Sequence, residues 1–396
     1  MTFAIVGCGY VADFYASNAR QHPDVSIKYG YDTDASRLNQ FSAHHGIAAA
    51  PDLNAVLEDS AVDIVLNLTN PRSHYKVTKA CLDTGKHVYS EKPLGMTVEE
   101  AEDLADYASS QGLRLGTAPC SVLSNTAQTL WKAIAEGAIG KVRMVYANYD
   151  DGMIAPNRKP WNWTSASGAH WPARDEFEIG CTYEHAGYFL TWLNAFFGPA
   201  RSVQAYASCQ IPDKGIEVDT MAPDFTAGCI EYDNGVVARV TCGLVAPRDK
   251  SMTVIGDDGY LFVRYLRNDT EPVYLRKDRM STNTHRMENL INGLRRRFAG
   301  ILDWLPWPSE EFLLYNQVPF ALSGSSYTAA KDKHVDFMLG PIEMAHAIAE
   351  DRPHRLSAES GVHIVEQIEA LQYPERFGYR RTDLSSPSRM DPLWNV

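Results

Sequence analysis

Short apolar runs alternate with helical patterns through the first third of the chain. The runs that predict strands are residues 3–6, 25–31, 62–68 and 87–90, and the helical patterns are 10–20, 75–83 and 97–111. Thr97 and Glu100 form a capping box at the start of the last helix, and Gly85 stands where a helix commonly ends. Strand–helix–strand repetition is typical of a parallel, doubly wound sheet. The pattern therefore predicts an α/β domain of the Rossmann type over residues 1–120.

Beyond residue 120 the pattern changes to consecutive strands joined by turn signals. Helical patterns occur at 126–136 and 184–197, and strand patterns at 142–149, 202–210, 226–232, 236–243, 252–255 and 260–265. Strands that follow one another at this spacing indicate an antiparallel sheet. We therefore expect an α+β second domain over 121–378, with a mostly antiparallel open sheet closed by late helices over 332–371. We expect residues 379–396 to form a C-terminal tail.

Composition and charge narrow the range of functions. The 396 residues are 45% hydrophobic and 22% charged, which is ordinary for a globular protein, and the formal net charge is −12. This acidic excess argues against nucleic acid as a partner but does not exclude a small anionic substrate. The seven cysteines show no metal-ligand spacing, so we expect neither disulfides nor a metal site. Without a signal peptide or a long apolar stretch, we expect a cytoplasmic protein with no transmembrane segment.

The first predicted strand is followed at once by a glycine-rich turn of the form GxGxxA. The turn residues expected to contact a cofactor are Gly7, Gly9, Tyr10 and Val11. Glycines at such a turn let backbone N–H groups approach a pyrophosphate, and the helix N-terminus favours its negative charge. Asp32 ends the second strand, where a carboxylate binds a ribose 2′-hydroxyl and repels a 2′-phosphate. The combination predicts a dinucleotide site that prefers NAD to NADP. The alternative is a helix-packing turn with a capping aspartate.

Two further signatures follow, TNPRSH at 69–74 and GKHVYSEKP at 85–93. Together with the glycine turn they resemble the Gfo/Idh/MocA family, named for glucose–fructose oxidoreductase and inositol dehydrogenase. The resemblance covers nearly the whole chain, since 226–261 is similar to the family's sheet pattern and 336–355 to its late helix. It implies a two-domain, nicotinamide-dependent oxidoreductase that acts on a sugar-like substrate.

The resemblance also implies roles for residues in these signatures. Lys92 is implied to stand beside the reacting hydroxyl, where a cation can stabilise alkoxide character or donate a proton. Glu91 could orient it, and the bond before Pro93 is implied to be cis. The residues similar to the family's loop near the ribose and nicotinamide are Thr69, Asn70 and His74. An ordinary surface Glu–Lys pair and a helix-capping histidine are the competing interpretations.

The chain departs from the family's pattern Asp-x-Gly-x-His-x-x-Asp at the helix of the substrate domain. His185 takes the histidine position, whereas Cys181 and Tyr188 replace the two aspartates and Tyr183 replaces the glycine. A neutral imidazole can move a hydroxyl proton at physiological pH, so we interpret His185 as the general acid or base. Glu184 could supply the missing carboxylate, although consecutive helical residues point about 100° apart. The alternative is a core histidine.

Tryptophans and small hydroxyl residues gather in one loop, 161–171. Flat aromatic faces pack against the C–H faces of sugars while polar neighbours bind the hydroxyls. The candidate substrate contacts are Trp161 and Trp163 of this loop, together with Tyr183 and Glu184 next to His185. An equally weighted alternative is that the tryptophans cover the domain junction.

One amphipathic stretch, RMENLINGLRRRFAGILDWLPW at 286–307, combines a basic triplet with a Phe/Leu/Trp face. Three interpretations compete: an oligomer contact or lid, a clamp for an anionic substrate, and a membrane-surface helix. We favour the first, in a homodimer or homotetramer.

These patterns predict an enzyme that exchanges a hydride between NAD(H) and a hydroxyl or keto carbon of a sugar, cyclitol or sugar derivative. One alternative is a lyase or hydrolase that retains NAD and oxidises its sugar only transiently, which turnover without added cofactor would reveal. An alternative of another class is an NAD-binding regulator without catalysis, suggested by the two replaced aspartates.

Overall fold

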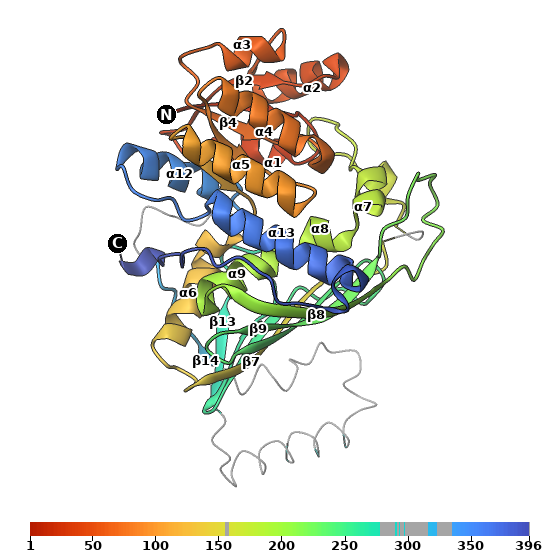
Figure 1. The fold of residues 1–396 in the computed structure, drawn as a ribbon, viewed down its shortest axis with the longest axis vertical. Coiled ribbons are helices and arrows are strands. Elements are labelled where there is room, and N and C mark those ends of the chain that lie inside the picture. Colours follow the sequence, from red (N-terminus) through yellow and green to blue (C-terminus); the bar gives the residue numbers. More distant parts are fainter. Residues whose placement is uncertain are drawn as a thin grey trace.

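The computed structural model of the chain describes residues 1–154, 158–277, 316–322 and 335–395, together with the single positions 290, 293 and 297. It contains two sheets, with the N-terminal sheet at the top of Figure 1 and the larger one below a layer of helices. The stretch 286–307 lies almost entirely outside the described residues, so its interpretations stay predictions.

The first sheet is parallel and has the strand order β3-β2-β1-β4-β5-β6, which confirms the predicted Rossmann arrangement. Its strands are β1 (Thr2–Val6), β2 (Ser26–Tyr31), β3 (Ala48–Ala49), β4 (Ile64–Asn67), β5 (His87–Ser90) and β6 (Leu115–Thr117). Its helices are α1 (Ala12–Ala19), α2 (Ala35–His45), α3 (Leu53–Leu57), α4 (His74–Asp83) and α5 (Val98–Ser110).

Alternation along β1 explains why helices cover both faces of this sheet. Phe3 and Ile5 pack in one apolar cluster with residues of α1 and α2, whereas Ala4 and Val6 pack in a second cluster with residues of α3, α4 and α5. The carboxyl ends of the central strands therefore meet at one edge of the sheet, where ligands bind in open α/β folds.

The second sheet is mixed and has the order β14-β13-β12-β11-β7-β10-β9-β8-β15. Its strands are β7 (Val142–Asp150), β8 (Ala200–Ser208), β9 (Phe225–Tyr232), β10 (Val237–Gly243), β11 (Met252–Gly256), β12 (Gly259–Val263), β13 (Val273–Lys277), β14 (Asn316–Gln317) and β15 (Arg380–Arg381). Every pair is antiparallel except β10 with β7, so the prediction of a mostly antiparallel sheet is confirmed.

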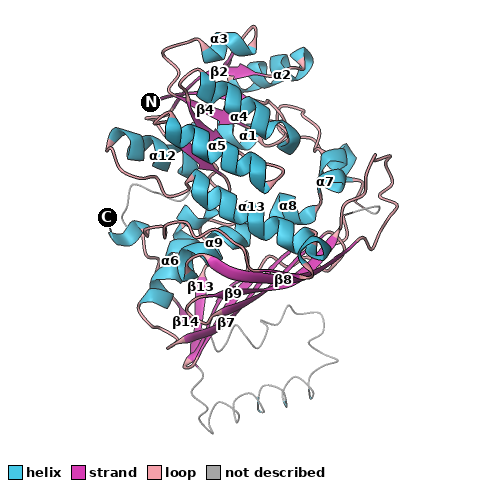
Figure 2. Ribbon diagram, viewed as in Figure 1, coloured by secondary structure: helices cyan, strands magenta, loops and turns pink. Residues whose placement is uncertain are grey.

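The helices of the second half are α6 (Asn125–Ala135), α7 (Ala173–Ile179), α8 (Cys181–His185), α9 (Gly187–Phe197), α12 (Leu339–Ala349) and α13 (Ala358–Gln372). Of these, α6, α8, α9 and α13 cover one face of the second sheet (Figure 2), whereas α12 packs against β6 of the first sheet. The apolar pattern at 184–197 predicted one helix, but the chain breaks it at Ala186 into α8 and α9. α13 packs against both α5 and β8, so this late helix joins the two sheets. Within the described ranges, no helix is long and apolar enough to cross a membrane.

Candidate active site

The glycine turn between β1 and α1 has the shape that a dinucleotide phosphate needs. Gly7 has a φ of 93°, and a Cβ atom there would lie 2.6 Å from backbone atoms of Leu68 and Thr69, so only glycine permits this approach. At Gly9 a Cβ atom would meet no protein atom within 4 Å, so the space beside the turn is open. α1 begins without a side-chain cap at Val11, so no side chain blocks its N-terminus, although the Ala12 N–H already donates to Gly9 O. These residues fit the diphosphate of NAD(P).

Asp32 is fixed at the end of β2 next to this turn. Its Oδ2 accepts a hydrogen bond from the Cys8 backbone N–H at 2.8 Å, and its Oδ1 accepts one from Asp34 N–H at 2.8 Å. The side chain of Arg37, which was not predicted, brings Nη1 to 3.4 Å from Asp32 Oδ2. Tyr10 also lies in the turn and packs edge-on against a phenylalanine of α1. The carboxylate is thus held where a Rossmann domain binds ribose hydroxyls.

His74 joins the loops that follow β4 and β5. Its buried ring places Nδ1 2.7 Å from Pro93 O and Nε2 3.0 Å from Thr69 O. Burial lowers the pKa of His74, and the two carbonyls partly oppose that effect. Asn67 accepts a hydrogen bond from the Thr69 hydroxyl at 2.7 Å, and Asn70 Oδ1 accepts one from a backbone N–H at the start of the next helical turn. His74 and Asn70 therefore shape the loops through contacts with the protein itself.

Lys92 and Glu91 lie at the carboxyl end of β5, and the Lys92–Pro93 bond is cis. Lys92 Nζ lies 2.5 Å from Glu184 Oε2, and the two side chains are only 17% and 12% exposed. Glu91 Oε1 accepts a hydrogen bond from the Tyr15 hydroxyl at 2.8 Å. Burial lowers the pKa of Lys92, but Glu184 and Glu91 outweigh it and raise that pKa above its ordinary value. The lysine is therefore protonated at neutral pH.

His185, the last residue of α8, is buried against the end of β7. Its ring stacks on Tyr149 with centroids 4.8 Å apart, and its Nε2 lies 3.3 Å from Glu176 Oε1 and 3.5 Å from Asp151 Oδ2. Its Nδ1 is buried and has no hydrogen-bond partner among the described residues. Burial lowers the pKa of His185 to about 3, so the imidazole is neutral at physiological pH.

Three of the groups around His185 were not predicted from the sequence. Lys250 is buried, its Nζ contacts Asp151 Oδ1, and it lies 4.2 Å from the centroid of the Tyr149 ring. Burial lowers the pKa of Lys250 to about 8, although Asp151 opposes this shift. Burial and the neighbouring carboxylates of Glu184 and Asp151 raise the pKa of Glu176, although Lys92 opposes this shift. The sequence signal that could have identified Asp151 was its position, because it lies two residues after the strand predicted over 142–149.

The two consecutive residues Glu184 and His185 both reach the site, since Glu184 contacts Lys92 and His185 lies beside Asp151. Tyr183 points elsewhere, since it is 2% exposed and its hydroxyl donates to Met96 O at 3.1 Å. The structure therefore groups Lys92 with Glu184 and leaves Tyr183 at the contact with the N-terminal domain.

The tryptophan loop lies against the cofactor domain. Ser167 N–H donates to Asp13 Oδ2 of α1 at 2.8 Å, which attaches the loop to the helix that starts at the glycine turn. Trp161 is partly buried over Gly215, where a Cβ atom would come within 2.9 Å of its ring. Trp163 is 36% exposed and packs on Trp171 with ring centroids 5.5 Å apart. Trp161 thus serves packing, whereas part of Trp163 remains accessible to a ligand.

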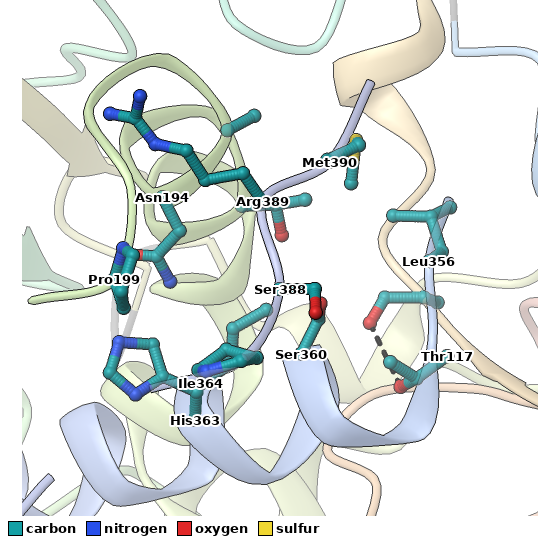
Figure 3. A pocket seen from close by; sticks show the side chains of 14 residues that line it. Thr117, Asn194, Pro199, Leu356, Ser360, His363, Ile364, Ser388, Arg389 and Met390 are labelled. Carbon is teal, nitrogen blue, oxygen red and sulfur yellow. Dashed lines mark hydrogen bonds between the residues drawn. The ribbon is translucent and has the colours of Figure 1, made fainter. Parts of the chain in front are cut away.

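A small enclosed cavity lies away from these residues, between α9, α13 and the C-terminal segment (Figure 3). Its volume of about 30 Å³ has room for one or two water molecules rather than for a sugar. Asn194, His363 and Arg389 are among its lining residues, and none of the predicted site residues is. We therefore assign it no part in the site.

Comparison with known protein families finds one match in the first part of the chain and a second match in the part that follows. The model described as "Oxidoreductase family, NAD-binding Rossmann fold" matches residues 1–118, and the GFO/IDH/MocA C-terminal domain matches residues 127–262. The trans-1,2-dihydrobenzene-1,2-diol dehydrogenase of Bos taurus is 23% identical over 265 residues, which are 65% of this chain and 72% of that protein.

Solved structures share the fold over nearly the whole chain. The aldose-aldose oxidoreductase of Caulobacter crescentus superposes with a TM-score of 0.70 at 17% identity, covering 96% of this chain and 99% of that one. The WlbA dehydrogenase of Bordetella pertussis, solved with NADH and UDP-GlcNAcA, gives a TM-score of 0.68 at 18% identity, covering 99% and 98%.

Proposed function

This chain belongs to the Gfo/Idh/MocA family of oxidoreductases, and on that premise we propose that it exchanges a hydride between NAD(H) and a hydroxyl-bearing carbon of a sugar, cyclitol or sugar derivative. The observation that carries the proposal is the Lys92–Glu184 pair beside His185, at the sheet edge next to the glycine turn. When bound, the nicotinamide supplies the hydride acceptor or donor.

Lys92 stabilises the reacting oxygen. Because Glu184 and Glu91 keep it protonated, it can donate a hydrogen bond to the substrate hydroxyl and stabilise the negative charge that develops as hydride leaves. Glu184 fixes the direction of the ammonium group through their 2.5 Å contact. Lys92 is thus a catalytic residue, and Glu184 is a positioning residue.

His185 moves the proton. Its Nε2 faces the carboxyl groups of Asp151 and Glu176. When the imidazole takes the hydroxyl proton, the nearby Asp151 carboxylate stabilises the imidazolium, as an aspartate does in hydrolase triads. Carbonyl reduction follows the same path in reverse.

The cofactor in this proposal is NAD rather than NADP. Asp32 is held at the end of β2 by two backbone N–H groups, so its negative charge stays in place. A fixed carboxylate there binds both ribose hydroxyls of NAD and repels the additional phosphate of NADP.

Lys92→Met tests the proposal, since methionine keeps most of the side-chain length and removes the charge. We expect NAD affinity near the wild-type value and a kcat lower by a factor on the order of 10² to 10³, which is typical of losing one preorganised electrostatic donor. Lys132→Met, which breaks an exposed pair with Glu136, is the matched control. Wild-type turnover by Lys92→Met would place the reacting centre elsewhere.

A further inference from the structure

Arg267 lies near the proposed reacting centre and has no carboxylate partner among the described residues. Arg267 is partly buried, and its guanidinium carbon lies 4.9 Å from the ring centroid of Tyr188 and 5.9 Å from that of Phe337. Its Nη1 donates a hydrogen bond to the Tyr149 hydroxyl at 3.3 Å. In the part of the chain that the structure describes, no carboxylate oxygen lies within 4.0 Å of this guanidinium. A guanidinium has five N–H donors, so most of its binding capacity is unused.

The neighbouring charges are already matched to other groups. Glu184 pairs with Lys92, and Asp151 pairs with Lys250. Asp269 is two residues from Arg267 along the chain, but its Oδ2 accepts the Asp336 backbone N–H at 2.7 Å and burial raises its pKa to about 7. Cations enclosed in a protein are normally paired, so the missing partner of Arg267 points to a bound anion.

Stacked rings connect Arg267 to the proposed catalytic groups. His185 stacks on Tyr149, and Tyr149 stacks on Tyr188 with centroids 5.2 Å apart, while Arg267 contacts both tyrosines. Tyr188 stands at the position where the family's pattern has an aspartate. In this chain a neutral ring therefore faces the guanidinium where a carboxylate would neutralise it.

We propose, building on the function proposed above, that Arg267 binds a carboxylate of the substrate, and that the substrate class is a sugar acid, either a uronic or an aldonic acid. The planar fork of a guanidinium matches the two oxygens of a carboxylate. One unpaired cation between aromatic rings balances one negative charge, whereas a doubly charged phosphate normally requires more donors.

The test compares neutral sugars with their acids in matched pairs: glucose with glucuronate and gluconate, galactose with galacturonate, and xylose with xylonate. Purified protein loaded with NAD is assayed for reduction of NAD, and binding of each compound is measured by calorimetry. We expect the wild type to prefer an acid over its neutral partner. Arg267→Met should lower that acid-to-neutral ratio of kcat/KM by a factor on the order of 10 to 100, the scale of one hydrogen-bonded charge.

Arg264→Met is the matched control, because Arg264 is exposed and lies three residues earlier on the same segment. It should keep the wild-type ratio, and Arg267→Lys should restore only part of the preference because lysine lacks the fork. If a neutral sugar is the best substrate and Arg267→Met leaves the ratio unchanged, the carboxylate proposal fails while the oxidoreductase proposal stands. If neither class binds or reduces NAD in the NAD-loaded protein, both fail.

Discussion

Replacing Glu184 by glutamine tests how the site holds its lysine. Glutamine is nearly isosteric and keeps one oxygen that can accept a hydrogen bond from Lys92, but it removes the charge. The wild-type contact is 2.5 Å long, and both side chains are less than one-fifth exposed. Solvent therefore screens the pair only in part, and the loss of charge should be measurable both in stability and in turnover.

The expected cost in the free energy of unfolding is about 2 kcal/mol, the value of a hydrogen bond to a charged group in a mostly buried setting. The sign of the pH dependence follows from the pKa of Lys92, which Glu184 and Glu91 raise above 10.5. A raised pKa contributes stability that is fully present below the ordinary lysine pKa and is lost as pH rises through the folded-state value. Glu184→Gln should thus be destabilised from neutral to mildly alkaline pH, because the stability from the charged pair begins to be lost only above the ordinary lysine pKa.

Thermal unfolding between pH 7 and 11 and kcat for carbonyl reduction over the same range are the assays. We expect kcat to fall about 10- to 100-fold and its alkaline limb to move to lower pH, because the pKa of Lys92 falls without Glu184. Glu136→Gln, which changes an exposed pair with Lys132, is the control and should match the wild type. An unchanged melting temperature and an unshifted alkaline limb in Glu184→Gln would refute the positioning role.

Two further substitutions test the cofactor and proton sites. Asp32→Ser should narrow or reverse a wild-type preference for NAD over NADP, and equal wild-type kcat/KM with both cofactors would contradict the ribose role of Asp32. His185→Ala should retain NAD binding and lose at least about 100-fold in kcat, whereas activity within a few-fold would identify a core histidine. Burial holds the pKa of His185 at about 3, below its value in the unfolded chain. The free energy of unfolding should therefore decrease by about 2 kcal/mol as pH falls from 6.5 to 5. The melting temperature of His185→Ala should fall less steeply over that interval.

The N-terminal half of this site was predictable because local sequence determines it. Gly7, Gly9 and Asp32 lie at the ends of strands that the pattern of apolar runs and helices predicts. Neighbouring parallel strands bring their carboxyl ends to the same edge of the sheet. The sequence indicated that His74 belongs to the loop near the cofactor. It could not show that both ring nitrogens contact backbone carbonyls of the protein itself.

The part of the site that the C-terminal domain contributes depends on contacts between residues far apart in the chain. Glu176, Lys250 and Arg267 come from a helix, a loop and a strand-end segment, and only tertiary packing places all three around Tyr149 and His185. Their individual sequence contexts contain no motif. The helix expected over 184–197 is confirmed except at Ala186, a single turn residue between α8 and α9 that helix propensity does not reveal.

Transfer of deuterium to the cofactor tests the central claim most directly. The protein is incubated with NAD and sugars or sugar acids that carry deuterium on their hydroxyl-bearing carbons, and the cofactor is then examined by mass spectrometry and NMR. Hydride exchange predicts NADH that carries one deuterium at C4 of the nicotinamide, at a rate that Lys92→Met lowers by two to three orders of magnitude. Protein that binds NAD tightly yet leaves it oxidised and unlabelled with every compound would contradict hydride transfer and identify the chain as a nicotinamide-binding regulator.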